Sequence, residues 1–492
     1  MSAFKSNSGT WQRVAVWGVV ILALVWLAPE LWARLGGGGG YSGGGGGSSS
    51  SGGGGGDAEA IGVLLELWVR FCIRYPYIGL PMTGGIVYWW IKHSDDEVES
   101  LIVAPEPVDW EKLRKHDANF SEVLLRDFGY SLFAKIHEAR GAGQLSRYRQ
   151  YLKDGAIERL QLMNTHVTDV QGVVVGSMQM DQLRVSMGPD EFATIRLRYD
   201  ANYTEICGTD AQAVYTRQTW KLRRRADALS PPPERISSLG CVGCGSSEEP
   251  ASDGTCPHCG NQYERGEHHW LVTGVTETAS RNVGPALTTK ADDVGYDLPT
   301  IFDPDLEAAK QQLLAEHPDM DFRRFCDRVR HIYHSLQKAW SEQHLDALRP
   351  YETDSLFHNH KYWIQEYQRQ SLRNVLEEVK LDGLEVVKVR SDKFYDAITC
   401  RLRASMIDYT VDSDGKTVCG SRSKSTKFSE YWTLVRGRDC GGHDKGDEAC
   451  PNCGAVLKIS MAGECEYCGS KLSSGDFDWV LSEIQQDEAY GG

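Results

Sequence analysis

The sequence predicts an α+β fold in two tandem copies, each with helices packed on one face of a curved antiparallel sheet. Two observations support this prediction. In each half, apolar residues at helical spacing are followed by apolar residues in strict alternation, and the same blocks recur about 200 residues later. A third feature, a pair of CxxC motifs near the end of each copy, predicts a metal-bound insert in each domain.

The first copy opens with a predicted helix. Asn119 followed by Glu122 is typical of a helix start, and the sequence Gly141-Ala142-Gly143 predicts where the helix ends. A second helix is expected from about Leu145. The apolar stripe of the first helix comprises Val123, Leu124, Phe128, Leu132 and Ile136.

Alternating residues later in each copy predict half-buried strands, because successive side chains of a strand point to opposite faces. In the first copy Ile195, Leu197, Tyr199, Ala201 and Tyr203 alternate with Arg196, Arg198, Asp200 and Asn202. In the second copy Ile398, Cys400, Leu402, Ala404 and Met406 follow the same spacing.

The repeat extends over most of both copies and indicates two copies of one domain. The cysteine quartets and the following tryptophan, Trp270 or Trp479, are displaced by 209 residues, and Trp220 matches Trp432 at 212. These four tryptophans are expected to pack inside the domains. Asp127, Phe133, Ala139, Leu145, Arg149 and Tyr151 match Asp327, Tyr333, Ala339, Leu345, Arg349 and Tyr351 at 200, and Arg196-Leu197-Arg198 matches Arg401-Leu402-Arg403 at 205.

The two cysteine quartets predict two structural zinc sites, within ribbons at 241–259 and 450–468. Two CxxC turns can surround one ion, and four cysteine ligands leave no coordination position for a water molecule. Disulfides, an iron site and, for the CPHC motif, thiol-disulfide chemistry are the alternatives. The expected ligands are Cys241, Cys244, Cys256 and Cys259 in the first copy and Cys450, Cys453, Cys465 and Cys468 in the second.

The N-terminus carries an export-like signal. Two basic residues, Lys5 and Arg13, precede an uncharged apolar run from Val14 to Ala28. Residues 1–35 are therefore expected to be a signal peptide or a signal anchor. The apolar run is short for a bilayer-spanning helix.

A second apolar region follows a Gly/Ser-rich flexible linker at 36–57. Residues 58–92 are predicted to associate with a membrane, and Tyr75–Ile91 is the best spanning candidate, with a buried soluble helix as the alternative. Two crossings return the chain to the reducing side. We therefore expect the inner (plasma) membrane, with the bulk of the chain cytoplasmic.

Charge bears on the choice of partners. Lys and Arg total 53 against 68 Asp and Glu, which gives a net charge of -15 and argues against nucleic acid as a partner. The basic run Lys221, Arg223, Arg224 and Arg225 is expected to be a solvated strand end. His331, His334, His344, His358 and His360 lack a metal-binding pattern and are expected on solvated helix faces.

The helical segments NFSEVLLRDFGYSLFAKIHEARGAGQLSRYRQYL and FRRFCDRVRHIYHSLQKAWSEQHLDALRPYE resemble the opening of the Tim-forty-four-like (Tim44-like) domain family. This family includes the mitochondrial inner-membrane import-motor tether and bacterial relatives. The resemblance covers residues 105–280 and 305–485, separated by a linker at 281–304. It implies a cone-like fold of the nuclear-transport-factor-two-like kind, with an apolar pocket between helices and sheet.

Two functions fit these observations. The first is a membrane-anchored, non-enzymatic scaffold that binds protein partners or lipid at the cytoplasmic face, linked to protein translocation or membrane-protein assembly. The second is a small-molecule-binding protein or enzyme that uses the cone pocket. The sequence shows no nucleophile motif and no Asp/His pair at matching positions of both copies, which favours the scaffold.

Overall fold

The computed structural model describes residues 108–491, with gaps at 164–165, 187–191, 441–448, 461–462 and 488–489 and at parts of 232–268 and 283–294. From residue 108 onward, these residues belong to one compact unit. The predicted signal segment 1–35, the linker 36–57 and the membrane segment 58–92 lie outside the described residues. Within the described part of the chain, no helix is long and apolar enough to cross a membrane.

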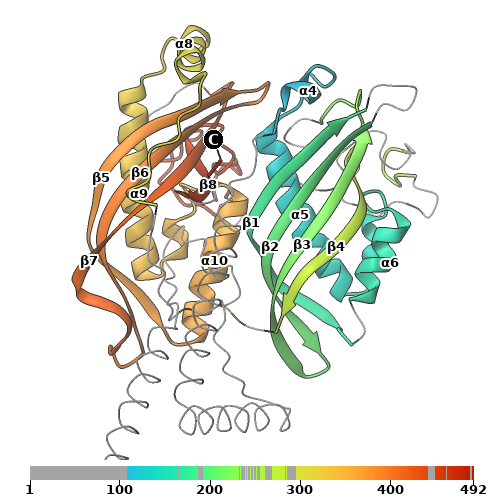
Figure 1. Cartoon of the computed structure of the whole chain (residues 1–492), viewed down its shortest axis with the longest axis horizontal. Coiled ribbons are helices and arrows are strands. Elements are labelled where there is room, and N and C mark those ends of the chain that lie inside the picture. The colour runs from blue at the N-terminus through green and yellow to red at the C-terminus, as the bar shows by residue number, and fades with distance from the viewer. Residues whose placement is uncertain are drawn as a thin grey trace, which may run out of the picture. The chain divides into compact units, whose positions relative to one another are not determined.

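The first copy is a helical layer on a four-stranded antiparallel meander, in the order β1-β2-β3-β4. Figure 1 shows the four strands side by side, with α5 behind them. The helical elements are α4 (Glu111–Arg114), α5 (Glu122–Gly141), the 3-10 turn η2 (Leu145–Tyr148) and α6 (Asp154–Leu162). The strands are β1 (Asp169–Val185), β2 (Phe192–Cys207), β3 (Asp210–Arg225) and β4 (Leu271–Arg281).

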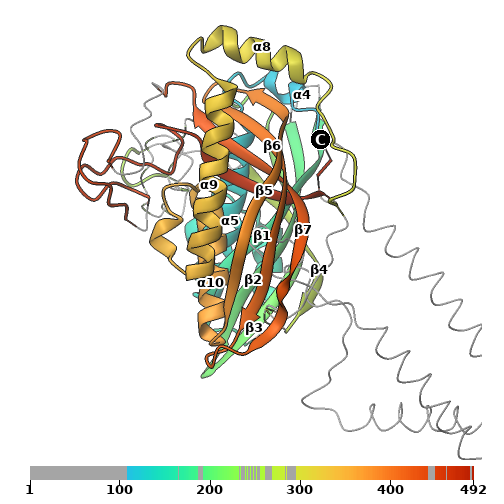
Figure 2. The same cartoon turned by 90° about the vertical axis from the view of Figure 1, so that its left-hand side faces the viewer.

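The second copy repeats this order of elements, again as a meander, β5-β6-β7-β8. Figure 2 shows α9 and α10 running along one face of its sheet. Its helical elements are α8 (Leu306–Glu316), α9 (Phe322–Glu342), the 3-10 turn η3 (Leu345–Ala347) and α10 (Asp354–Arg369). Its strands are β5 (Arg373–Ser391), β6 (Tyr395–Val411), β7 (Thr417–Gly437) and β8 (Val480–Gln486). The α+β prediction is confirmed in both copies.

The bounds of α5 follow from its end residues. The helix starts after Ser121, whose hydroxyl accepts a 3.2 Å hydrogen bond from the backbone N–H of Leu124, so the cap is Ser121 and not Asn119. The helix ends where it meets β1, and a Cβ on Gly141 would lie 2.1 Å from the backbone nitrogen of Val170. The second helix predicted from Leu145 is instead the turn η2, and α6 begins only at Asp154.

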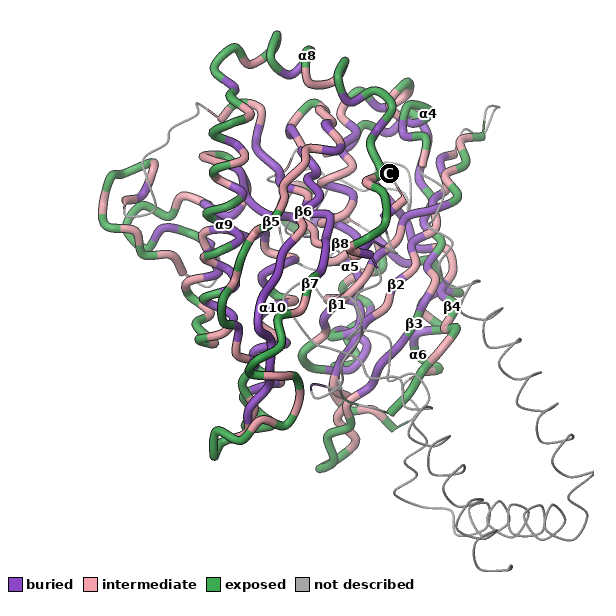
Figure 3. The backbone as a smooth tube through the Cα atoms, turned by 60° about the vertical axis from the view of Figure 1, so that its left-hand side comes forward, coloured by how far each residue is buried: buried purple, intermediate pink, exposed green. Residues whose placement is uncertain are grey.

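The strand predictions hold differently in the two copies. Along β2 the burial alternates as expected, because one face packs on α5 and the other does not. Along β6 nearly every residue is buried, which Figure 3 shows as an almost continuous purple strand. The expected half-buried strand is therefore wrong for β6. Residues 295–300 cover part of its second face, where the carbonyl of Leu298 accepts a 2.8 Å hydrogen bond from Arg401, and α5 covers the start of the strand, where Leu124 packs on Tyr395.

The first helix of one copy also packs against the other copy. Leu124 of α5 forms an apolar cluster with Tyr395, Val435 and Val480 of the second sheet. On the next turn, Asp127 accepts a hydrogen bond of 3.0 Å from the hydroxyl of Ser355 in α10. Because α5 is covered on both its own sheet side and this side, eleven of its residues are buried.

Candidate metal centres

The sulfur atoms of each quartet lie at the separations expected of a tetrahedral metal site. Four sulfurs around an ion at about 2.3 Å are about 3.8 Å apart, whereas a disulfide brings two sulfurs to about 2.05 Å. The paired sulfurs lie at 3.7 Å (Cys241–Cys259), 3.8 Å (Cys244–Cys256), 3.8 Å (Cys450–Cys468) and 3.9 Å (Cys453–Cys465). Within each quartet all four ligand atoms are within 4.8 Å of one another.

This geometry suits structural metal sites, for which zinc is the natural ion, and does not suit disulfides. None of the eight cysteines forms a disulfide, so both predicted quartets come together without an S–S bond. In each quartet the first and third cysteines are buried, whereas the second is exposed. In each site two cysteines are therefore buried against the protein, and the other two lie nearer to the solvent.

The backbone turns explain why glycine follows the second cysteine of a motif. Gly260, Gly454 and Gly469 have φ of 71°, 73° and 71°, the left-handed conformation that glycine adopts without steric cost. Each donates its N–H to the carbonyl four residues earlier, at 2.8 to 2.9 Å, which closes the turn. Gly245, which follows the second cysteine of the first motif, lies outside the described residues.

Two of the thiols are already biased toward the thiolate form that a metal requires. The backbone N–H of Cys259 is the main cause that lowers the pKa of Cys256 to about 7. The hydroxyl of Ser470 is the main cause that lowers the pKa of Cys468 to about 6. Hydrogen bonds to sulfur of this kind favour the charged form. In the same quartets, a backbone hydrogen bond to Cys244 and another to Cys453 are outweighed by desolvation and by contacts with the other cysteines, which raise the pKa of Cys244, and that of Cys453 to about 11. Only part of each quartet is therefore biased toward the thiolate.

The second ribbon is fastened to the start of α10. Asp354 accepts hydrogen bonds from Lys471 at 2.7 Å and Ser473 at 3.0 Å, and it also pairs with the buried Arg349. Gly463 fits between these groups with φ of 78°, and a Cβ there would lie 2.3 Å from the Ser473 hydroxyl. The ribbon is therefore positioned by charge-assisted contacts as well as by its metal ligands.

A buried arginine joins the first ribbon's flank to the helices. Arg224 lies over the ring of Trp270, 4.8 Å from its centroid, and its guanidinium pairs with Asp117 at 2.5 Å. The expectation that the basic run is solvated is therefore wrong for Arg224, which is 1% exposed, whereas Lys221, Arg223 and Arg225 are exposed. Burial of this charge is tolerated because a carboxylate neutralises it.

The second copy keeps the arginine and changes its acid. Arg436 lies 4.8 Å from the ring centroid of Trp479, as in the first copy, but pairs with Asp396 of β6 at 3.3 Å. His317 occupies the repeat position of Asp117 and lies 3.2 Å from the same Asp396 carboxylate. The matching tryptophans are buried in both copies, as expected.

Of the second-copy histidines, His360 departs from the expectation of a solvated helix face. It is buried and hydrogen-bonded to Glu352 at 2.5 Å. The matching positions of the first copy are Leu152 and Leu160, so this pair is a feature of one copy only. His331, His334, His344 and His358 are exposed, as expected.

Aromatic rings occupy the interior of the first copy, where the resemblance implies an apolar pocket. Phe133 lies 4.4 Å from His137, 4.5 Å from Tyr199 and 5.2 Å from Trp220, measured between ring centroids. A cavity of about 560 Å³ lies elsewhere, between the two copies, where Trp110, Arg126 and Met180 face Lys388, Glu483 and Tyr490. Sequence reasoning missed this cavity, because no local pattern shows which faces of two copies meet.

The fold and the ribbons define a class of protein. Its domains have helices packed on one antiparallel sheet and a site in which four cysteines can bind one metal ion. A protein-family model described as the Tim44-like domain matches residues 306–446, from the start of α8 to a point just before the second ribbon at 450–468. Residues 306–446 are therefore a Tim44-like domain, and residues 111–281 form a second, similar α+β unit. The family is generally non-catalytic. No curated protein matches the chain.

Proposed function

We propose that the chain is a non-enzymatic scaffold that holds a protein partner or lipid at the cytoplasmic face of the inner membrane, in protein translocation or membrane-protein assembly. The observation behind this proposal is the Tim44-like domain at 306–446, which suggests a tether or scaffold role. The apolar segments at 1–35 and 58–92 supply the proposed attachment.

The chemistry of the described residues supports a binding role over a catalytic one. Both cysteine quartets have four protein ligands, so a bound zinc ion would have no open position at which to activate water. Zinc in these sites would fix the ribbons, and their side chains would do no further chemistry. The buried His360–Glu352 pair has no counterpart in the first copy.

A second candidate function is small-molecule binding in the cavity between the copies. The cavity of about 560 Å³ has room for a ligand and mixes apolar side chains with charged ones. Its cations Arg126, Lys388 and Arg390 face acids such as Glu122, Asp303 and Glu483. This balance of charge favours no particular ligand charge, so the scaffold remains the first candidate.

Membrane attachment can be tested without disturbing the compact unit. The full chain and a chain lacking residues 1–92, which removes both proposed attachment segments, would be expressed and cross-linked, and membranes and cytosol would then be separated. We expect the full chain to sediment with membranes and to cross-link a protein partner, and the shortened chain to lose both. Loss of neither would contradict the proposal, and turnover of a small molecule by the purified protein would favour the cavity.

Topology can be tested with a reporter that is active only outside the cytoplasm. A fusion within residues 40–56 should be active, and a fusion after residue 110 should be inactive. Activity at both positions would place the ribbons in an oxidising compartment and would contradict both the topology and the zinc sites.

A further inference from the structure

The same strand meets different surroundings in the two copies. Arg401 of β6 is fully buried, and it donates hydrogen bonds to the carbonyls of Gly295 at 2.9 Å and Leu298 at 2.8 Å. Two residues on, Arg403 donates to the hydroxyl of Thr300 at 2.9 Å. A segment that begins with a turn at 295–298, closed by a 2.9 Å hydrogen bond from the N–H of Leu298 to the carbonyl of Gly295, thus lies on part of the outer face of the second sheet. The two arginines of the Arg-Leu-Arg motif hold it there.

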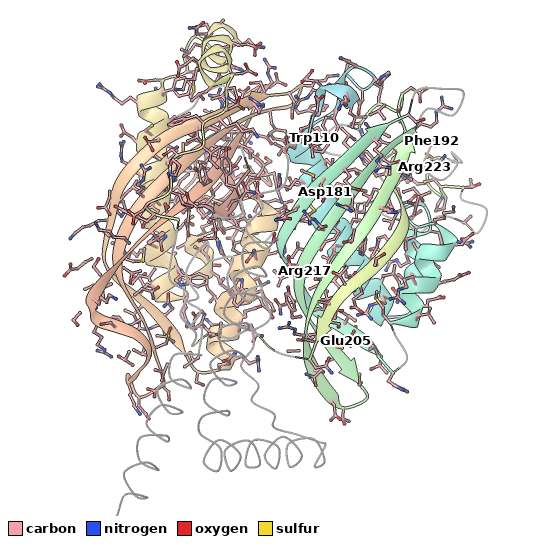
Figure 4. All side chains as sticks on the ribbon, in the orientation of Figure 1. Trp110, Asp181, Phe192, Glu205, Arg217 and Arg223 are labelled. Carbon is pink, nitrogen blue, oxygen red and sulfur yellow. The ribbon has the colours of Figure 1, made fainter. Side chains whose placement is uncertain are left out.

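Among the described residues, the matching arginines of the first copy have no hydrogen bond to a segment outside their sheet. Arg196 and Arg198 keep 30% and 42% of their side chains exposed. Both contact one carboxylate, Asp181 of β1, at 2.5 Å and 3.1 Å. Figure 4 shows Asp181 on the near face of this sheet, the face turned away from α5.

The two copies differ in the number of carboxylates that pair with the arginines of the Arg-Leu-Arg motif. In the second copy Arg403 pairs with Glu385 at 2.8 Å and Arg401 pairs with Asp487 at 2.6 Å, so each guanidinium has an acid. Glu385 is opposite Arg401 in the sheet register, as Asp181 is opposite Arg196. The first copy thus has one carboxylate where the second has two.

The surrounding face is basic, although the chain has a net charge of -15. The register of β1, β2 and β3 places these residues on one face, and Figure 4 labels Arg217 and Arg223 there. Its acids are Asp181 and Asp200. Its cations are Arg184, Arg196, Arg198, Arg217, Lys221 and Arg223. Such a face attracts an anionic partner.

We propose that the outer face of the β1–β4 sheet binds an acidic peptide of a partner protein, held by Arg196 and Arg198 in the way that Arg401 and Arg403 hold residues 295–300 on the second sheet. A partner carboxylate would pair with Arg196, and partner carbonyls would accept hydrogen bonds from the guanidiniums. The inference rests on the proposed scaffold role and specifies the contact by which the scaffold holds its partner.

Peptide fits this face better than nucleic acid does. Sheets that bind single strands stack bases on exposed aromatic rings. On the described part of this face, the guanidinium of Arg223 lies 3.3 Å from the centroid of Phe192 and so covers that ring. Tyr215 is buried, and its hydroxyl donates to Asp200 at 2.5 Å.

The test measures binding of a labelled peptide to the full-length protein in detergent, by fluorescence anisotropy. The probe is GYDLPTIFDPD, the sequence of residues 295–305, and the control peptide has asparagine at its three acidic positions. We expect the acidic peptide to bind roughly tenfold more tightly than the control peptide. No membrane is needed, so failure here is distinguishable from failure of the membrane-attachment experiment.

Variants of the protein locate the binding site. Arg196→Gln should weaken binding roughly tenfold, and Asp181→Asn should strengthen it by freeing both guanidiniums. Lys221→Gln, at an exposed side chain, should weaken binding without affecting the fold. Arg330→Gln is the matched control, because Arg330 is 50% exposed on α9, away from this sheet.

Three outcomes would overturn the proposal. Equal binding of the acidic and neutral peptides would remove the charge argument. Unchanged binding in both Arg196→Gln and Lys221→Gln would place the peptide elsewhere. Tighter binding of a single-stranded oligodeoxythymidine than of the peptide, lost in the same two variants, would assign the face to nucleic acid.

Discussion

Arg126 of α5 and Glu483 of β8 form an ion pair of 2.6 Å that joins the two copies. Only 16% and 14% of these side chains are exposed, so the pair is largely removed from water. Glu122 lies on the preceding turn, 3.5 Å from the same guanidinium. Because buried charges need partners, this contact requires both copies to be folded and in register.

Removal of one member should destabilise the whole compact unit. We expect Glu483→Gln to lower the free energy of unfolding by about 2 to 3 kcal/mol, because Arg126 would keep its charge in a largely buried place. Denaturant unfolding followed by fluorescence measures this change. Asp327→Asn, which breaks an exposed pair with Arg330, is the control and should cost under about 0.5 kcal/mol. Equal effects would mean that the pair between the copies contributes no more than a surface pair.

The comparison of β2 with β6 shows what the sequence could and could not predict. Both segments have apolar residues at every second position. This alternation correctly predicts that both are strands and which side chains face the helices. Part of the second face of β6 is buried by residues 295–300, and Arg401 is buried with Asp487, which is 86 residues away in the chain. Burial by residues that are distant in the sequence does not change the pattern of apolar and polar residues along the strand, so this pattern cannot predict it.

In the candidate metal centres, too, the features formed by residues close in the sequence were predictable, and the contacts between distant residues were not. The metal ligands were predictable because each CxxC turn is local and the spacing of the two turns suits one ion. The anchoring of the second ribbon by Asp354 was not predictable, since Lys471 comes from more than one hundred residues later. Likewise, Asp117 and Asp396 neutralise matching arginines from unrelated positions, so the repeat does not predict them.

Asp127 should make the stability of the protein depend on pH. Burial is the main cause that raises the pKa of this carboxyl to about 6, above its unfolded value of about 4. Between these values the folded state binds more protons than the unfolded state, so the free energy of unfolding falls as pH rises from about 4 to about 6. At neutral pH the ionised group costs about 3 kcal/mol, since one pKa unit corresponds to about 1.4 kcal/mol.

Asp127→Asn should remove this cost, because the amide oxygen can still accept the hydrogen bond from Ser355. We expect the variant to gain about 3 kcal/mol at pH 7.5 and little at pH 4, measured by denaturant unfolding at both pH values. Asp327 is the matched control: it occupies the same repeat position with 65% of its side chain exposed, and its amide variant should show no such pH-dependent gain. A gain that is equal at both pH values would contradict the assignment.

Metal content tests the quartets. The purified full chain should contain about two zinc ions, because each of the two quartets offers four thiolates. Cys256→Ser should leave about one ion and loosen the ribbon at 241–259, whereas Cys207→Ser, outside the quartets, should leave two. Elemental analysis by mass spectrometry gives the count. Iron at the same stoichiometry would identify a different metal, and metal-free oxidised thiols would support disulfides.

Gly463 provides a steric test of how the second ribbon docks. Gly463 and Gly454 have nearly the same φ, 78° and 73°, so alanine at either position carries a similar backbone cost of about 1 kcal/mol. Only at Gly463 would the new Cβ meet other groups, 2.3 Å from the Ser473 hydroxyl and 2.4 Å from the Arg349 guanidinium, whereas Gly454 has open space.

Gly463→Ala should therefore separate the ribbon from α10, while Gly454→Ala should leave it docked. The expected result is faster amide exchange in residues 463–477 and at the start of α10 in the first variant, measured by hydrogen exchange with mass spectrometry on the zinc-loaded protein. The first variant should also lose the contribution of the contacts between Asp354 and the ribbon, about 1 to 3 kcal/mol in total. If both variants exchange alike, the close packing around Gly463 does not hold the ribbon, and the metal ligands alone position it.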